Sequence, residues 1–100
     1  MKLPKKIRLG GKTFGIILWN RDDEAESNSG SISHGNQTIK ILKTHPDQMR
    51  DTLWHEAVHM VLTAAGLMEA NKNEAMVAIL AHGIDDILAN NPDIRGMYEK

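Results

Sequence analysis

The segment His55-Glu56-Ala57-Val58-His59 places two imidazoles four positions apart, with a carboxylate directly after the first. In an α-helix, residues i and i+4 lie on one face about one turn apart, so both imidazoles can bind a single divalent ion. Glu56 lies about 100° around the helix from His55. This is too far for easy coordination, but it lets the carboxylate reach a water on the open side of the ion. The spacing therefore predicts a metal site in which Glu56 is the general base.

The ion expected at this site is zinc, held by imidazole and carboxylate because the chain contains no cysteine. The alternative is an amphipathic helix whose histidines face solvent beside Gln48 and Thr52. That alternative gives little reason for three polar side chains to interrupt an otherwise apolar segment, which runs through Leu53-Trp54 before the motif and Met60-Val61-Leu62 after it.

A third protein ligand must come from elsewhere, because a catalytic zinc usually takes three and leaves a fourth position for water. The metzincin continuation requires glycine at position 62 and histidine at position 65, where this chain has Leu62 and Ala65. Glu74 is the preferred candidate, since it follows the break expected at Gly66 and opens a second helix. Glu69, in the intervening turn, is the alternative ligand.

The surroundings of Glu74 support a ligand role but also allow a simpler one. On a helix, Ala78 and Ala81 lie within about 40° of Glu74, and such a small-residue face lets two helices approach closely. However, Asn71-Lys72-Asn73-Glu74 is also typical of a helix cap followed by a residue that favours the helix dipole. Both interpretations of Glu74 remain open from the sequence.

Other polar residues have weaker assignments. His82 either lines the cleft or is a partly buried helix residue. Asp85 shares the face of Glu74 but is expected to lie too far away, and with Asp86 it is expected to be solvated helix surface. Three candidates for a donor that stabilises the transition state have no spacing argument behind them, namely Tyr98, His82 and His34.

Two helices must position these residues. Pro46 suits the first helical position and Gly66 the end of the helix, with His45 as the expected cap. A second helix is expected from Asn71 or Asn73 to Asn90, before Pro92. The predicted apolar stripe of the first helix, opposite the histidines, is Leu53, Ala57, Met60, Val61, Ala64 and Ala65. The predicted stripe of the second is Met76, Val77, Leu80, Ile84, Ile87 and Leu88.

The first part of the chain predicts two β-hairpins. Segments 5–9 and 12–19 flank Gly10-Gly11, and segments 31–34 and 37–43 flank Gly35-Asn36. The polar, acidic segment 20–29 between the hairpins is expected to be a loop. The predicted fold is one α+β domain over residues 1–100, with a small antiparallel sheet packed on the histidine-bearing helix and the glutamate-bearing helix.

Composition narrows the class of protein and of partner. With 100 residues the chain can build one core, and its net charge of -1 gives no electrostatic case for nucleic acid. The basic residues near the start, Lys2, Lys5, Lys6 and Arg8, are better explained as a solvated strand edge. No segment approaches the roughly 20 apolar residues of a membrane span, so no membrane contact and a cytoplasmic location are expected. The expected state is a monomer or weak oligomer.

Three segments together resemble a known family. Residues 36–41, 51–59 and 73–84 are similar to small phage and prophage zincin-like metallopeptidases, a resemblance that covers about residues 30 to 92. It implies the gluzincin arrangement, with zinc bound by His55, His59 and Glu74 and with Glu56 as base. In larger gluzincins an acidic residue four positions after the glutamate orients a histidine, but this chain has Ala78 there.

The leading functional hypothesis is zinc-dependent hydrolysis of peptide bonds, with a peptide or protein substrate paired along an exposed edge strand. So small a chain has little room for side-chain pockets, which favours low selectivity, one specific protein substrate, or a partner protein that presents the substrate. The first alternative is a catalytically silent zinc-binding regulatory or interaction module of phage origin. The second is a phage structural or adaptor protein without metal.

Overall fold

The structure, a computed structural model, describes residues 3–20 and 30–99. Four strands precede four helices, in the order β1 (Lys6–Leu9), β2 (Lys12–Trp19), β3 (Gly30–Ser33), β4 (Thr38–Leu42), α1 (Pro46–Ala64), α2 (Met68–Asn71), α3 (Glu74–Asn90) and α4 (Pro92–Gly96). The expected α+β class is confirmed. The loop predicted over 20–29 lies, from residue 21 onward, outside the described residues.

Both predicted hairpins are present, but the sheet is mixed rather than wholly antiparallel. Strands β1 and β2 pair antiparallel, as do β3 and β4, whereas β2 and β4 pair in parallel, giving the order β1-β2-β4-β3. This arrangement places the two most apolar strands side by side in the centre. The short β1 and the serine-containing β3 take the edges, where one side of a strand lacks a strand partner.

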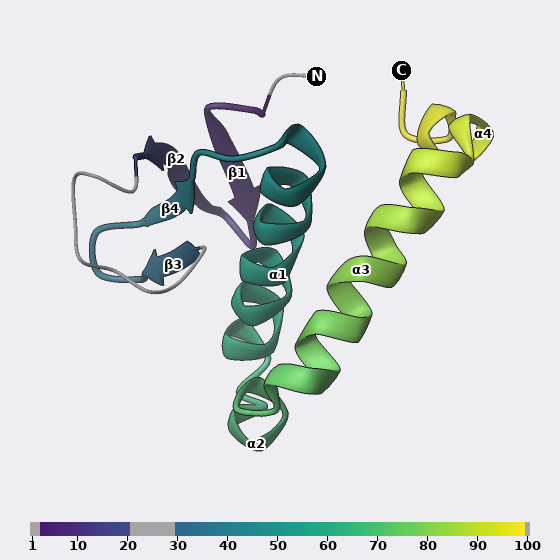
Figure 1. The fold of residues 1–100 in the computed structure, drawn as a ribbon. Helices are drawn as coiled ribbons and strands as arrows, with labels where there is room; N and C mark the ends of the chain where they lie inside the picture. Colours follow the sequence, from purple (N-terminus) through teal and green to yellow (C-terminus); the bar gives the residue numbers. More distant parts are fainter. Residues whose placement is uncertain (1–2, 21–29, 100) are drawn as a thin grey trace.

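Helix α1 lies between the sheet and α3, so the molecule has three layers (Figure 1). Its contact with the sheet buries Leu53 and Met60 among Phe14, Ile39 and Ile41. Its contact with α3 forms a second cluster that consists of Val58, Leu62, Val77 and Ala81. Because α1 is covered on two sides, most of its polar residues lie on what remains of its surface, and Glu56 is the exception that is buried.

The burial pattern corrects the predicted apolar stripes. On α1, Val61, Ala64 and Ala65 are exposed, because the side that α3 covers is formed by Val58 and Leu62 instead. On α3, the predicted Leu80 and Ile87 are exposed. The stripe on α3 is narrower than predicted because only one face of this helix, the face toward α1, is packed.

The predicted helix ends are confirmed within a residue or two. Gly66 has a φ of 74°, the left-handed conformation that follows many helices, and α1 ends just before it. The side chain of Asn73 accepts a hydrogen bond from the backbone N–H of Met76 and caps α3. His45 occupies the cap position of α1 without a side-chain hydrogen bond. Within the described residues, no helix combines the length and apolarity needed to cross a membrane.

Strand β3 approaches α1 closely at Gly30. A Cβ atom at this position would lie 2.5 Å from Cγ2 of Thr52 and 3.2 Å from the carbonyl oxygen of Lys40. Thr52 is β-branched and has little freedom to move aside. A glycine is therefore what allows the edge strand to pack against the helix that carries the histidines.

Replacing Gly30 by alanine is expected to destabilise the protein by about 1–3 kcal/mol, the usual cost of overpacking. The measurement is the free energy of unfolding in urea. The matched control is Gly35→Ala, because a Cβ at Gly35 meets nothing within 4 Å. Equal stability of the two variants would contradict the close packing of β3 on α1.

Candidate metal centre

Three side chains from two helices converge at one place. Nε2 of His55 lies 3.0 Å from Oε2 of Glu74, and Nε2 of His59 lies 3.0 Å from Oε1 of the same carboxylate. The two imidazole rings have centroids 5.0 Å apart, as expected for neighbours one turn apart on α1. The Gly66 break reverses the chain, so Glu74, the first residue of α3, comes back to the histidine face of α1.

The donor set fits a zinc ion. In the group formed by His55, His59 and Glu74, the potential ligand atoms all lie within 4.8 Å of one another. The two histidine–glutamate separations of 3.0 Å are close to the separation of about 3.3 Å between ligand atoms around a tetrahedral zinc. Two imidazoles and one carboxylate also match the ligand types of a catalytic zinc that keeps one position open.

No family model, curated protein or solved structure matches this chain.

Glu56 lies beside the ligand group without belonging to it. It is only 7% exposed, whereas the side chain of Glu74 is 66% exposed. A Cβ at Gly30 would lie 3.7 Å from Cγ of Glu56, so this carboxylate sits beneath the edge strand β3. Burial raises the pKa of Glu56, and this effect exceeds the lowering by His59 and His55, while Glu74 raises the pKa further. A pKa shifted upward from its ordinary value suits a group that must accept and release a proton near neutral pH.

Asn71, expected from the sequence only at the start of the second helix, lies at the candidate site. Its Oδ1 lies 2.6 Å from Nδ1 of His59, and its Nδ2 donates to Oγ1 of Thr63 at 3.1 Å. The cap itself is provided by Asn73, which leaves the neighbouring Glu74 free to point at the histidines. Spacing alone gives no indication of this contact, because asparagines are common in turns.

The remaining candidates lie outside the ligand group. Glu69, the alternative third ligand, is exposed in α2 and is not part of it. His82 is not the partly buried residue considered above, because its side chain is 78% exposed. His34 packs edge-on against the ring of Phe14, and Tyr98 is 78% exposed near the end of the chain. Among the described residues, none of the three proposed transition-state donors joins His55, His59 and Glu74.

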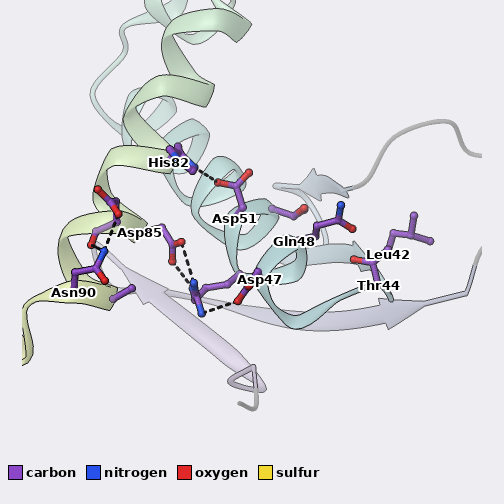
Figure 2. A pocket seen from close by; sticks show the side chains of 12 residues that line it. Leu42, Thr44, Asp47, Gln48, Asp51, His82, Asp85 and Asn90 are labelled. Atoms are coloured by element: carbon purple, nitrogen blue, oxygen red, sulfur yellow. Dashed lines mark hydrogen bonds and ion pairs between the residues drawn. The ribbon is translucent and has the colours of Figure 1, made fainter.

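A hollow of about 740 Å³ opens between the first half of α1 and the second half of α3 (Figure 2). Its lining includes Gln48 and Thr52, which share the helix face of His55. His55, His59 and Glu74 do not line the hollow. The expectation of little room for side-chain pockets beside the metal centre therefore stays a prediction. The other polar residues that line the hollow include Asp47, Asp51, His82 and Asp86.

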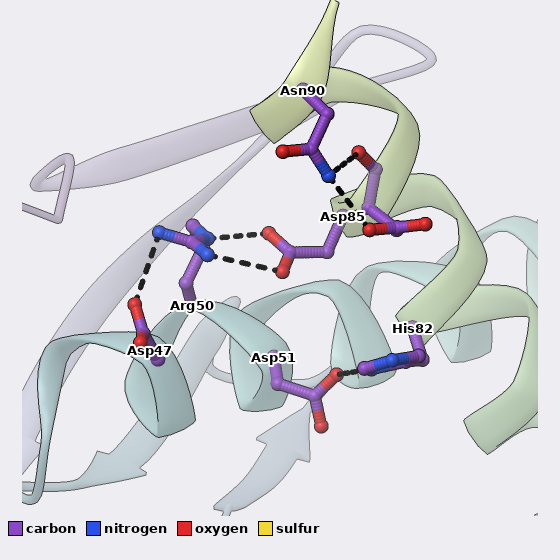
Figure 3. A network of polar contacts seen from close by, with 7 residues as sticks. Asp47, Arg50, Asp51, His82, Asp85 and Asn90 are labelled. Carbon is purple, nitrogen blue, oxygen red and sulfur yellow. Dashed lines mark hydrogen bonds and ion pairs between the residues drawn. The ribbon is translucent and has the colours of Figure 1, made fainter.

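Asp85 is buried, in contrast to the prediction of a solvated residue. It is 9% exposed and accepts two hydrogen bonds from the guanidinium of Arg50, through Nε and, at 3.3 Å, through Nη2 (Figure 3). This contact raises the pKa of Arg50, chiefly through the hydrogen bonds to Asp85. The prediction failed because α3 packs along α1, so the face that carries Glu74 meets Arg50 three turns later. The pair fixes the second half of α3 on α1.

The variant Asp85→Asn is expected to lower the free energy of unfolding by about 1–3 kcal/mol, because it removes the buried charged partner of Arg50 and leaves the exposed Asp47. Zinc binding should be unchanged, since Glu74 lies about 16 Å away along the helix. The matched control is Asp86→Asn, an exposed neighbour. The measurement is thermal and urea unfolding of both variants. Equal stability would contradict a stabilising contact between Asp85 and Arg50.

Proposed function

We propose that this chain is a zinc-dependent peptidase of the minimal gluzincin type, of phage or prophage origin. The observation that carries the proposal is the convergence of two histidine Nε2 atoms on the Glu74 carboxylate, with the buried Glu56 beside them but outside the ligand group. A purely structural metal site needs no such additional carboxylate, whereas hydrolysis needs a base near the ion.

The proposed mechanism divides the work among four side chains. His55, His59 and Glu74 would hold the ion, which would supply Lewis-acid activation of the attacking water and of the scissile carbonyl. The Glu56 carboxylate accepts the proton of the attacking water and delivers it to the leaving amine. The solvent-exposed position of Glu74 leaves this side of the centre open to substrate.

Strand β3 is the proposed binding edge for the substrate backbone. Among the described residues β4 is its one strand partner, so its other edge is available for pairing with an extended peptide. The start of β3 at Gly30 lies against Glu56, which places this edge beside the proposed base. We therefore propose a peptide or protein substrate, presented in extended form, and activity in the cytoplasm, of the host if the chain is phage-encoded.

A catalytically silent zinc-binding module is the second candidate. One observation favours it: Ala78 replaces the acidic residue that orients a histidine in larger gluzincins. Such a module would bind zinc through the same three ligands and use it to stabilise a surface for a partner protein.

The test is a mixed peptide library incubated with zinc-loaded protein and with protein stripped by a chelator. Mass spectrometry should detect new cleavage products only in the zinc-loaded sample, and adding zinc back should restore them. Identical products in both samples would reject peptidase activity on free peptides and favour the silent module.

A further inference from the structure

We propose that Asn71 is the positioning residue for His59, an inference that rests on the proposed metal centre. The amide links two side chains of α1 through its two ends: Oδ1 contacts Nδ1 of His59 at 2.6 Å, and Nδ2 donates to Oγ1 of Thr63 at 3.1 Å. His59 is the more buried of the two histidines, with 14% of its side chain exposed against 26% for His55. Water is thus less available to replace this contact.

The contact with Asn71 stabilises the neutral tautomer of His59 whose Nε2 is free to bind a metal. A neutral imidazole carries its proton on one of its two nitrogens, and a metal requires the other nitrogen to be free. Nε2 of His59 faces Glu74. When this nitrogen binds the proposed ion, the proton of the neutral ring is on Nδ1. Oδ1 of Asn71 is the acceptor that stabilises this proton and fixes the orientation of the ring.

The position of Asn71 explains how this chain orients a histidine without the acidic residue found in larger gluzincins. Ala78, at that position, is exposed on α3. Asn71 instead belongs to α2, in the connection between the two ligand-bearing helices, where its backbone N–H donates to the carbonyl of Leu67. Asn73, two residues later, caps the helix that presents Glu74. The short segment 71–73 thus orients the ring of His59 and precedes α3, the helix that carries Glu74.

The neutral amide also has an electrostatic consequence. Two neutral imidazoles and the Glu74 carboxylate leave one net positive charge on a bound Zn²⁺. An aspartate at position 71 would accept the same hydrogen bond while adding negative charge near the ion, which favours ion binding. Asn71→Asp is therefore the conservative variant that preserves the positioning contact.

The experiment measures the zinc dissociation constant by competition with a chromophoric chelator, for the full chain and three variants. Asn71→Ala should weaken zinc binding by about 10- to 100-fold, the usual effect of removing such a partner of a ligand. Asn71→Asp should bind at least as tightly as the parent chain. Asn90→Ala is the matched control, because it removes an exposed amide that donates to Asp86 within the end of α3.

A second readout is independent of the variants. In the zinc-loaded parent chain, ¹⁵N NMR of the histidine rings should show His59 protonated at Nδ1 and metal-bound at Nε2. The inference is overturned if Asn71→Ala binds zinc as tightly as the parent chain, or if the NMR spectrum shows the opposite tautomer. If the parent chain itself binds no zinc, the proposed metal centre is rejected. If the parent chain and Asn71→Ala bind zinc equally tightly, only the positioning role of Asn71 is rejected.

Discussion

The variant Glu56→Gln is expected to retain the fold and the bound zinc while hydrolysing peptides at least about 10²-fold more slowly, within the 10²- to 10⁴-fold range for loss of a general base. Glutamine keeps the size of the side chain and some hydrogen bonding, but it cannot accept a proton from water. Glu56 lies outside the ligand group, so we expect its replacement to leave zinc binding unchanged. A lower rate with unchanged zinc content would therefore indicate a catalytic role.

The measurement compares initial rates on one peptide identified from the library, at saturating zinc, together with zinc content by elemental analysis. Glu69→Gln is the matched control, because it makes the same change at an exposed carboxylate outside the ligand group. Equal rates for the parent chain and Glu56→Gln would remove Glu56 from the mechanism. Loss of zinc from Glu56→Gln would instead show that this carboxylate helps to hold the ion.

Zinc is expected to be a major source of stability for so small a domain. An ion that binds only the folded state stabilises it by about 4 kcal/mol when its free concentration is 1,000 times the dissociation constant. For a domain of this size, about 4–8 °C of Tm accompanies each kcal/mol, so zinc should raise Tm by about 15–30 °C. The side chains of the proposed ligands come from α1 and α3, so a bound ion would connect these two helices.

Thermal unfolding with and without zinc tests this expectation. The shift should be lost in His59→Ala and preserved in His82→Ala, which removes an exposed histidine of α3 that lies outside the ligand group. A similar zinc-dependent shift in both variants would place the stabilising ion elsewhere on the chain.

The features that the sequence predicted correctly are those encoded by nearby residues. Pro46 and Gly66 define the ends of α1, and the glycine pair at 10–11 separates the strands of the first hairpin. The i, i+4 spacing places His55 and His59 on one face, and the Gly66 break brings Glu74 back to them.

What the sequence missed depends on contacts between distant segments. The parallel pairing of β2 with β4 follows from how the two hairpins dock, which no turn residue specifies. The burial of Asp85 requires knowing that Arg50 lies opposite, 35 residues away along the chain. The contact of Asn71 with His59 requires the path of the connection after Gly66, a short segment without a strong pattern of its own.

The central claim is that His55, His59 and Glu74 bind a single zinc ion, and a crystal structure of zinc-loaded protein with anomalous scattering at the zinc edge tests it most directly. The expected result is one anomalous peak per chain, with both Nε2 atoms at about 2.0–2.1 Å and a Glu74 carboxylate oxygen at about 2.0–2.2 Å. A peak bound by Glu69 in place of Glu74 would correct the third ligand. A peak remote from His55 and His59, or no peak at all, would contradict the account.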